Sequence, residues 1–189
     1  MKLNLKLPKQ VEQFSGVIYF IIILLVSNTV WKLTVIGDES DTIVNFLSLD
    51  ISAPFNWMST HVASLTYKIV SLLGYEVNLE NEIIIRHLND NAVRVTWACS
   101  GLKQTYIMIC IIAFYKGSIQ KKLWYIPFTI FIVYLFNIFR IVVLAIIVKN
   151  HPEWFDFLHE ELLKYMFYLV IFGLWVLWEE KIRRVKTNQ

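Results

Sequence analysis

The chain has 189 residues, of which 57% are hydrophobic and only 17% are charged. A soluble domain is usually about half apolar and about a quarter charged, so this composition, with its apolar residues in long runs, indicates an integral membrane protein. The net charge of +3 does not indicate a nucleic-acid partner, because the lysines and arginines flank the apolar runs and form no single basic patch.

The first apolar run follows a short segment that carries Lys2, Lys6 and Lys9. We predict a first membrane span over residues 15–36, which is long enough to cross a bilayer. A cleaved signal peptide is the alternative, but its apolar core would be shorter and small residues would mark the cleavage site. Ser27-Asn28-Thr29 matches such a site poorly. We therefore expect the span to stay uncleaved.

Residues 37–98 form the one large polar region, with eight acidic residues and few basic ones. Within it, the stretch from Phe55 to Leu73 reads as a helix that includes polar residues such as His61 and Lys68. This mixture suits an amphipathic helix on the membrane surface, and a further full span is the alternative. We prefer the interfacial helix, because a full span would invert the polar segment that follows.

A short β-hairpin is predicted at the end of this region. Residues 82–88 and 92–97 flank Asn89-Asp90-Asn91, a sequence typical of turns. Apolar and polar side chains alternate from Val93 to Trp97, which is the period of a half-buried strand. The hairpin would lead the chain directly to Cys99.

Three further apolar runs predict spans over residues 99–115, 123–148 and 161–179. No internal repeat or low-complexity linker divides the chain, so we expect residues 1–189 to form a single membrane domain. The predicted fold class is all-α integral membrane. It is a four-span helical bundle with an extracytoplasmic insertion at 37–98 that contains an interfacial helix and a short β-hairpin.

The distribution of charge predicts the orientation. The N-terminal arm, residues 116–122 and the C-terminal tail are basic, whereas residues 37–98 and 149–160 are acidic or nearly neutral. Cytoplasmic segments of membrane proteins are enriched in lysine and arginine. We therefore expect a multi-pass protein of the cell (inner, cytoplasmic) membrane, with both termini in the cytoplasm and the acidic segments outside.

Three chemically notable residues fall at one depth in this arrangement. Cys99 begins the second span at its outer end. Arg140 lies about 17 residues into the third span, roughly 26 Å from the cytoplasmic end and near the outer edge of a hydrocarbon core about 30 Å thick. His159 precedes the fourth span on the same side. A thiol, a guanidinium and an imidazole are thus expected in one interface layer.

Each of these residues also has a structural interpretation. A cysteine in a membrane protein is usually a small apolar side chain, and we interpret Cys110 in this way. Cys99 differs, because a helix N-terminus favours the thiolate. Arg140 inside a span indicates function, although an ion pair or snorkelling to the surface is the alternative. His159 has a rival in the loop residue His151, and we favour His159 as the ordered group.

Together the residues suit nucleophilic catalysis. A cysteine nucleophile needs a base or a positive field, and its leaving group needs a proton. His159 could transfer protons, whereas Arg140 is permanently charged and would stabilise a thiolate or an oxyanion. Asn137 lies one helical turn before Arg140 and would orient it. The two cysteines are about 16 Å apart along a helix, beyond disulfide reach. We expect neither a metal nor another cofactor.

The sequence resembles the exosortase/archaeosortase family of integral-membrane cysteine transpeptidases, in a short form. The resemblance rests on Ala98-Cys99-Ser100-Gly101-Leu102 opening a span, on Asn137-Ile138-Phe139-Arg140 late in the next span, and on His159 before the last span. It covers about residues 93–178. It implies that Cys99 is the nucleophile, Arg140 the thiolate or oxyanion stabiliser, and His159 the general acid and base.

The resemblance further implies a protein-sorting reaction. The substrates would be membrane-tethered proteins that end in a short motif, a transmembrane helix and a basic tail. The enzyme would cleave this sorting signal at the outer face and transfer the protein to a lipid or a surface polymer.

Functions of other classes remain open. In a non-catalytic scaffold or assembly protein, Cys99 would be replaceable without loss. A thiol–quinone oxidoreductase would require a second cysteine near Cys99, which the sequence does not supply. A transporter could use Arg140 to bind an anionic substrate, but inverted repeats are not evident.

Overall fold

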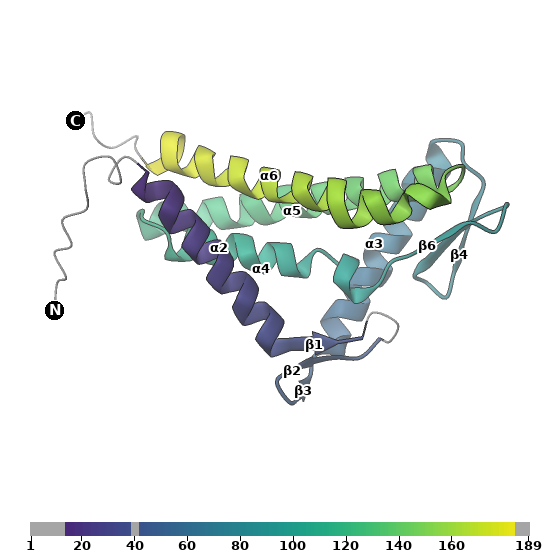
Figure 1. Ribbon diagram of the computed structural model, residues 1–189, viewed down its shortest axis with the longest axis horizontal. Coiled ribbons are helices and arrows are strands. Elements are labelled where there is room, and N and C mark those ends of the chain that lie inside the picture. The colour runs from purple at the N-terminus through teal and green to yellow at the C-terminus, as the bar shows by residue number, and fades with distance from the viewer. Residues whose placement is uncertain (1–13, 39–41, 184–189) are drawn as a thin grey trace.

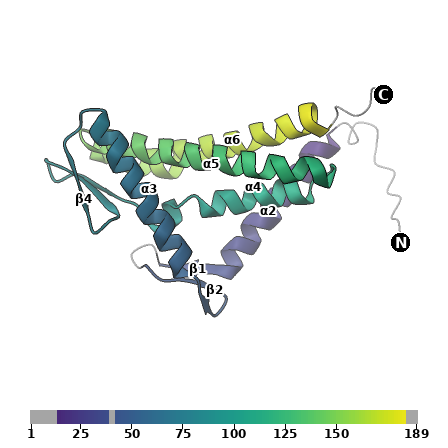
Figure 2. The same cartoon turned by 180° about the vertical axis from the view of Figure 1, so that it is seen from behind.

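A computed structural model of the chain describes residues 14–38 and 42–183. Helices α4 (Leu102–Phe114), α5 (Ile119–Val148) and α6 (Leu163–Leu177) run side by side in an elongated layer, and α2 (Ser15–Thr34) crosses this layer at an angle (Figure 1). The helix α3 (Ser52–Leu72) joins two small sheets. One sheet lies beside the end of α2, and the other lies at the end of the layer that is opposite the start of α2 (Figures 1 and 2). The protein is therefore mostly helical, with its strands in two separate sheets that α3 joins.

Within the part of the chain that the structure describes, three helical segments are long and apolar enough to cross a membrane: α2, α5 and the run Pro152–Ile182 that contains α6. These segments agree with a multi-pass membrane protein. The helix α4 (Leu102–Phe114) has 13 residues and is about 20 Å long, shorter than a hydrocarbon core of about 30 Å.

The second predicted span, 99–115, therefore extends beyond the observed helix α4 at both ends. The helix begins only at Leu102, because Trp97–Cys99 form a separate 3-10 turn and Gly101 adopts the left-handed conformation at φ +80°. Four full spans are not confirmed. The helix α4 nevertheless packs between α2 and α5 in the helical layer.

The polar region between α2 and α4 contains more strands than the sequence predicts. Strands β1 (Val35–Gly37), β2 (Val44–Phe46) and β3 (Leu49–Asp50) form one antiparallel sheet. A second antiparallel sheet contains β4 (Val77–Glu80), β5 (Ile84–His87) and β6 (Ala92–Arg94). Strands β5 and β6 pair across the predicted Asn89–Asn91 turn, and β4 adds a third strand to this hairpin.

The turn of this hairpin contacts the end of α5. The side-chain amides of Asn89 and Asn91 both donate to the carbonyl of Lys149, at 2.6 and 3.1 Å. Carbonyls at a helix C-terminus have no partner within the helix, so the turn satisfies a group that would otherwise need water. This contact fixes the sheet, and with it the strand that leads to Cys99, against the end of α5.

The helix predicted from Phe55 to Leu73 is present as α3 (Ser52–Leu72). Its buried residues Val62, Ala63 and Val70 share one hydrophobic core with β4–β6 and the last turns of α5. A second core lies between α2, α4, α5 and α6. Cys99 belongs to the first of these cores. The expected position of α3 on the membrane surface stays a prediction.

Candidate active site

Cys99 ends a short 3-10 turn, Trp97–Cys99, that joins β6 to α4. Its backbone N–H donates to the carbonyl of Thr96 at 2.9 Å, and only 7% of its surface is exposed. The thiol therefore lies just before the helix and not within its first turn as the sequence suggested. The helix dipole is thus a weaker influence on Cys99 than its neighbours from other elements are.

Asn137 of α5 holds the Cys99 turn in place. Its side-chain amide is 1% exposed and donates to the carbonyl of Cys99 at 2.9 Å. Gly101 allows this approach, because a Cβ there would lie 3.0 Å from the Asn137 side chain. We expected Asn137 to orient Arg140, but the Asn137 carbonyl oxygen has no hydrogen-bond partner among the described residues. The contact that the structure shows for Asn137 is thus with the Cys99 turn, and its role toward Arg140 stays a prediction.

His159 lies in a π-helical segment, Phe157–Leu162, that precedes α6. Its Nε2 is 3.6 Å from the sulfur of Cys99, although 60 residues separate the two in the chain. The imidazole stacks on the ring of Phe155, with centroids 5.4 Å apart and planes 6° apart. This stacking fixes the orientation of the ring that faces the thiol.

Arg140 is buried in α5, with 6% of its surface exposed. One of its terminal nitrogens donates to the carbonyl of His159 at 3.4 Å, and its Nε is buried with no partner among the described residues. The guanidinium therefore contacts the histidine segment and keeps one donor unused. His151 lies elsewhere, on the surface, 3.1 Å from the carboxylate of Glu153. The structure brings His159, not His151, to Cys99.

The surroundings of Cys99 act on its ionisation in opposite directions. Burial is the largest influence and raises the pKa of the thiol. The hydrogen bond with His159, the charges of His159 and Arg140, and the contact of the Thr96 hydroxyl at 3.8 Å all lower that pKa. Together they outweigh burial, so the pKa of Cys99 lies below its usual value. Such a thiol forms a nucleophilic thiolate more readily.

Cys110 differs from Cys99 in position and contacts. It is buried in the middle of α4, within the core between α2, α4, α5 and α6. Both cysteines are free thiols. The described residues contain no group of three or more histidine, cysteine, aspartate or glutamate side chains that could hold a metal ion.

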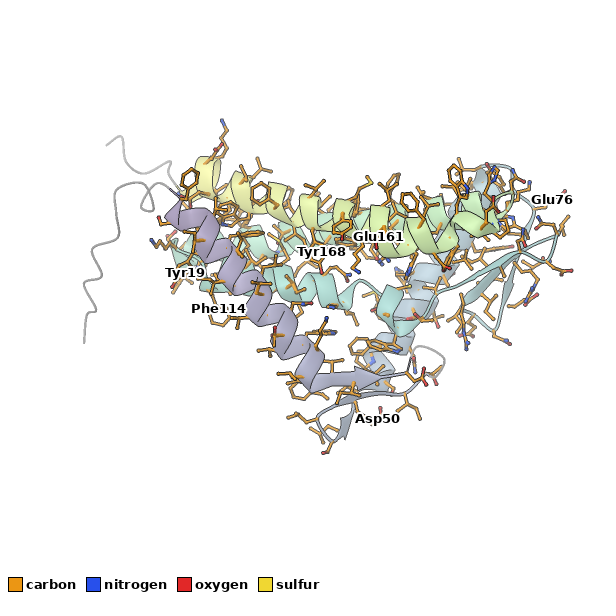
Figure 3. The ribbon with its side chains drawn as sticks, viewed as in Figure 1. Tyr19, Asp50, Glu76, Phe114, Glu161 and Tyr168 are labelled. Carbon is orange, nitrogen blue, oxygen red and sulfur yellow. The ribbon has the colours of Figure 1, made fainter. Side chains whose placement is uncertain are left out.

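A cavity of about 150 Å³ adjoins the cysteine–histidine pair on the side of α6. Its lining is mainly cationic and aromatic: Ala98, Lys103, Gln104, Arg140, His159, Lys164, Phe167 and Tyr168. Tyr168 lies on the side of α6 that faces α4 (Figure 3). We call this cavity the cationic pocket. Lys103 and Gln104 directly follow the Cys99 motif, and sequence reasoning did not single them out.

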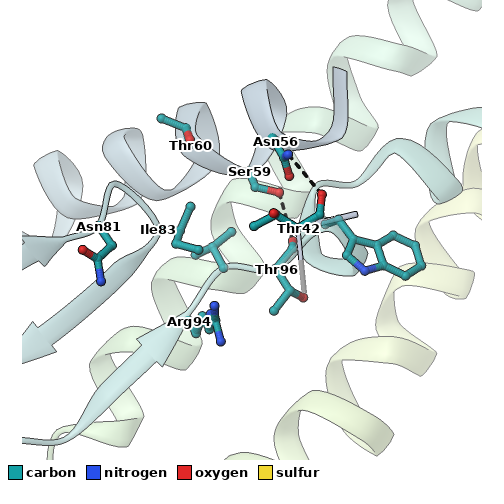
Figure 4. A pocket seen from close by; sticks show the side chains of 10 residues that line it. Thr42, Asn56, Ser59, Thr60, Asn81, Ile83, Arg94 and Thr96 are labelled. Carbon is teal, nitrogen blue, oxygen red and sulfur yellow. Dashed lines mark hydrogen bonds between the residues drawn. The ribbon is translucent and has the colours of Figure 1, made fainter. Parts of the chain in front are cut away.

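A second cavity, of about 210 Å³, lies beyond Thr96 on the side of α3. Hydroxyl and amide side chains dominate its lining: Thr42, Asn56, Ser59, Thr60, Asn81, Ile83, Arg94, Val95, Thr96 and Trp97 (Figure 4). Ser59 donates to the carbonyl of Thr96 at 3.1 Å and thereby fixes the strand end that precedes Cys99. The residues just before Cys99 in the chain thus line a polar cavity, and the residues just after it line the cationic pocket.

A family model described as transmembrane exosortase (Exosortase_EpsH) matches residues 42–178. No curated protein and no solved structure matches the chain. The matched region contains Cys99, Asn137, Arg140 and His159, which three separate segments bring together. The chain belongs to the transmembrane exosortase family.

Proposed function

We propose that this protein is a membrane-embedded cysteine transpeptidase that cleaves a C-terminal sorting signal from secreted proteins. The main support is one contact, the 3.6 Å approach of the His159 Nε2 to the Cys99 sulfur beside the buried Arg140. Covalent catalysis uses a nucleophile that lies within reach of a base, and a third group orients the base. The resemblance of the sequence to this family implies the same three residues.

In the first step, His159 accepts the proton of the Cys99 thiol. The thiolate attacks the carbonyl carbon of a peptide bond, and a sulfur–carbon bond forms while the carbonyl oxygen becomes an oxyanion. Arg140 has an unused buried N–H, which suits it to stabilise this charge. The carbon–nitrogen bond then breaks, and His159 returns its proton to the departing amine.

The product of this step is a thioester between Cys99 and the retained part of the substrate. A nucleophile from an acceptor, namely a lipid, a surface polymer or water, attacks the thioester carbonyl and releases the thiol. His159 takes the proton of the acceptor as it attacks. The reaction thus exchanges one acyl bond for another and needs neither an oxidant nor a metal.

A substrate tethered in the bilayer suits the position of the site. We propose that it ends in a short motif, a transmembrane helix and a basic tail, and that the helix brings the motif to the depth of Cys99. We also propose that the site faces the outside of the cell membrane, because the basic segments are expected in the cytoplasm.

The experiment follows a tagged substrate in cells that produce variants of this protein. Cys99→Ala should abolish removal of the C-terminal helix of the substrate. Cys110→Ala is the matched control, because it also replaces a buried thiol by a methyl group but does so in the core of α4. For Arg140→Lys we expect the processing rate to fall by about a hundred- to a thousandfold. The processing rate of His159→Ala should fall at least as far. His151→Ala should stay near the activity of the parent.

Protein abundance is measured in every variant, so that loss of folding is recognised. A thioester adduct trapped on Cys99 would support the nucleophile directly. Continued processing by well-produced Cys99→Ala protein would reject the enzyme and favour a scaffold function. If His151→Ala is inactive and His159→Ala is active, our choice of base is wrong.

A further inference from the structure

An apolar groove runs along α4 on the side that faces α2. It has a volume of about 490 Å³, and its walls include Trp31 of α2, Phe55 of α3, and Leu102, Tyr106 and Ile109 of α4. The three α4 residues recur at helical spacing, so they form one stripe about 10 Å long. The groove therefore begins next to the Cys99 turn and follows the helix away from it.

The end of the groove nearest Cys99 leads to positive charge. A neighbouring cavity of about 210 Å³ shares Trp31 and Phe55 with the groove and is lined by Lys32 and Lys103. That cavity in turn shares Ala98 and Lys103 with the cationic pocket. The apolar groove thus leads to a pair of lysines, and the lysines lead to the candidate active site.

Two lysines, Lys32 and Lys103, lie at this junction. Among the described residues, neither Lys32 nor Lys103 forms an ion pair with an acidic side chain. The positive charges of Lys32 and Lys164 instead oppose that of Lys103, which is half-buried. An anion placed between Lys32 and Lys103 would relieve this repulsion and accept charge-assisted hydrogen bonds.

We propose that the groove and the two lysines form a binding site for a membrane phospholipid. One acyl chain occupies the groove along α4, and the phosphate lies between Lys32 and Lys103. The ligand must combine an apolar segment with an anion at its end, because the apolar groove leads to a pair of cationic lysines. This binding is independent of whether Cys99 reacts, and it places the lipid headgroup beside Ala98, the neighbour of Cys99.

The occupant that we propose is a lipid and not the transmembrane helix of a protein substrate. An apolar helix would bring no anion to Lys32 and Lys103, whereas a phospholipid carries a phosphate at the end of its chains.

The test uses native mass spectrometry of the full-length protein in detergent, titrated with phosphatidylglycerol. Diacylglycerol, which has the chains without the phosphate, and glycerol phosphate, which has the phosphate without chains, are the comparison ligands. We expect one phosphatidylglycerol to be retained at concentrations where neither comparison ligand is. The same retention is expected in Cys99→Ala protein, so a failure of the proposed catalytic function would leave this result unchanged.

Variants test both ends of the site. Losing one lysine near a phosphate weakens lipid binding by roughly fivefold, so Lys32→Gln/Lys103→Gln protein should bind about 25-fold more weakly. Lys68→Gln/Lys116→Gln is the matched control, because these two exposed lysines line none of the three cavities. Thr105→Phe, which fills the groove, should also weaken binding. Thermal unfolding of each variant shows whether it is folded.

Three results would overturn the proposal. Equal retention of diacylglycerol would show that the groove binds chains without regard to the phosphate. Retention of glycerol phosphate at the same concentration would show an anion site that has no connection with the groove. Equal losses in the Lys32/Lys103 and Lys68/Lys116 variants would mean that the lysines act only through the general charge of the surface.

Discussion

The hydrogen bond from Asn137 to the carbonyl of Cys99 gives the sharpest test of how this site is held. It measures 2.9 Å, and the Asn137 side chain is almost fully buried. In Asn137→Ala protein this bond is lost and the buried carbonyl loses a donor, a change that costs about 1–3 kcal/mol. Because the bond joins the Cys99 turn to α5, we expect most of this cost to appear as local opening of that turn.

Local opening can be measured as the rate at which a bulky thiol reagent labels Cys99. The thiol is 7% exposed, so labelling requires the turn to move. A cost of about 1–3 kcal/mol multiplies the open population, and hence the labelling rate, by roughly 5- to 150-fold when opening is rapid. The measurement is made in a Cys110→Ala background, so that only one thiol reports.

Thr129→Ala is the control for this experiment. Thr129 is also a buried polar residue of α5, but its hydroxyl donates to Ile126 within the same helix. Its loss should leave the labelling of Cys99 unchanged. If Asn137→Ala labels no faster than Thr129→Ala, the Asn137 bond does not hold the turn, and our account of the site is wrong at that point.

Three further predictions concern ionisation, packing and topology. Because the pKa of Cys99 is lowered, labelling of Cys99 by a small reagent should persist to lower pH in the folded protein than in the chain unfolded by denaturant. The labelling rate should fall as the pH drops through the lowered pKa. Coincident pH profiles of the folded and unfolded chains would contradict this. Gly117→Ala should lower the unfolding temperature, because Gly117 has φ +148° and a Cβ would overlap the Trp178 ring, whereas Gly173→Ala, where a Cβ meets nothing, should not. In a chain without Cys99 and Cys110, an impermeant reagent applied to intact cells should label a cysteine at Asn89→Cys and not at Ser118→Cys; the reverse pattern would invert our map.

Some features of the fold follow from local sequence. The apolar runs identify α2, α5 and the helical run that contains α6, because length and hydropathy are properties of a continuous segment. The Asn89–Asn91 turn likewise predicts the β5–β6 hairpin. The strands of the first sheet and β4 were missed. They are two to four residues long, too short for a clear period, and they are stabilised by pairing with distant partners.

The second predicted span shows where local reasoning was insufficient. The apolar pattern could not separate the 3-10 turn at Cys99 from α4, because both are apolar and adjacent. The left-handed Gly101 makes that break, and its conformation allows the turn to approach Asn137. The position of Cys99 relative to the helix is thus set by packing against α5.

The sequence by itself determined that the protein is an integral membrane protein, and it singled out Cys99, Arg140 and His159 as residues at one depth. The depth of a residue in the membrane, however, does not say which direction around its helix the side chain faces. Only the tertiary structure decided that the His159 ring lies 3.6 Å from the Cys99 thiol, that the Asn137 amide donates to the Cys99 carbonyl, and that Lys32 and Lys103 line one cavity beside them. These contacts join segments up to 71 residues apart, and they depend on how the helices rotate and pack, which no local pattern encodes.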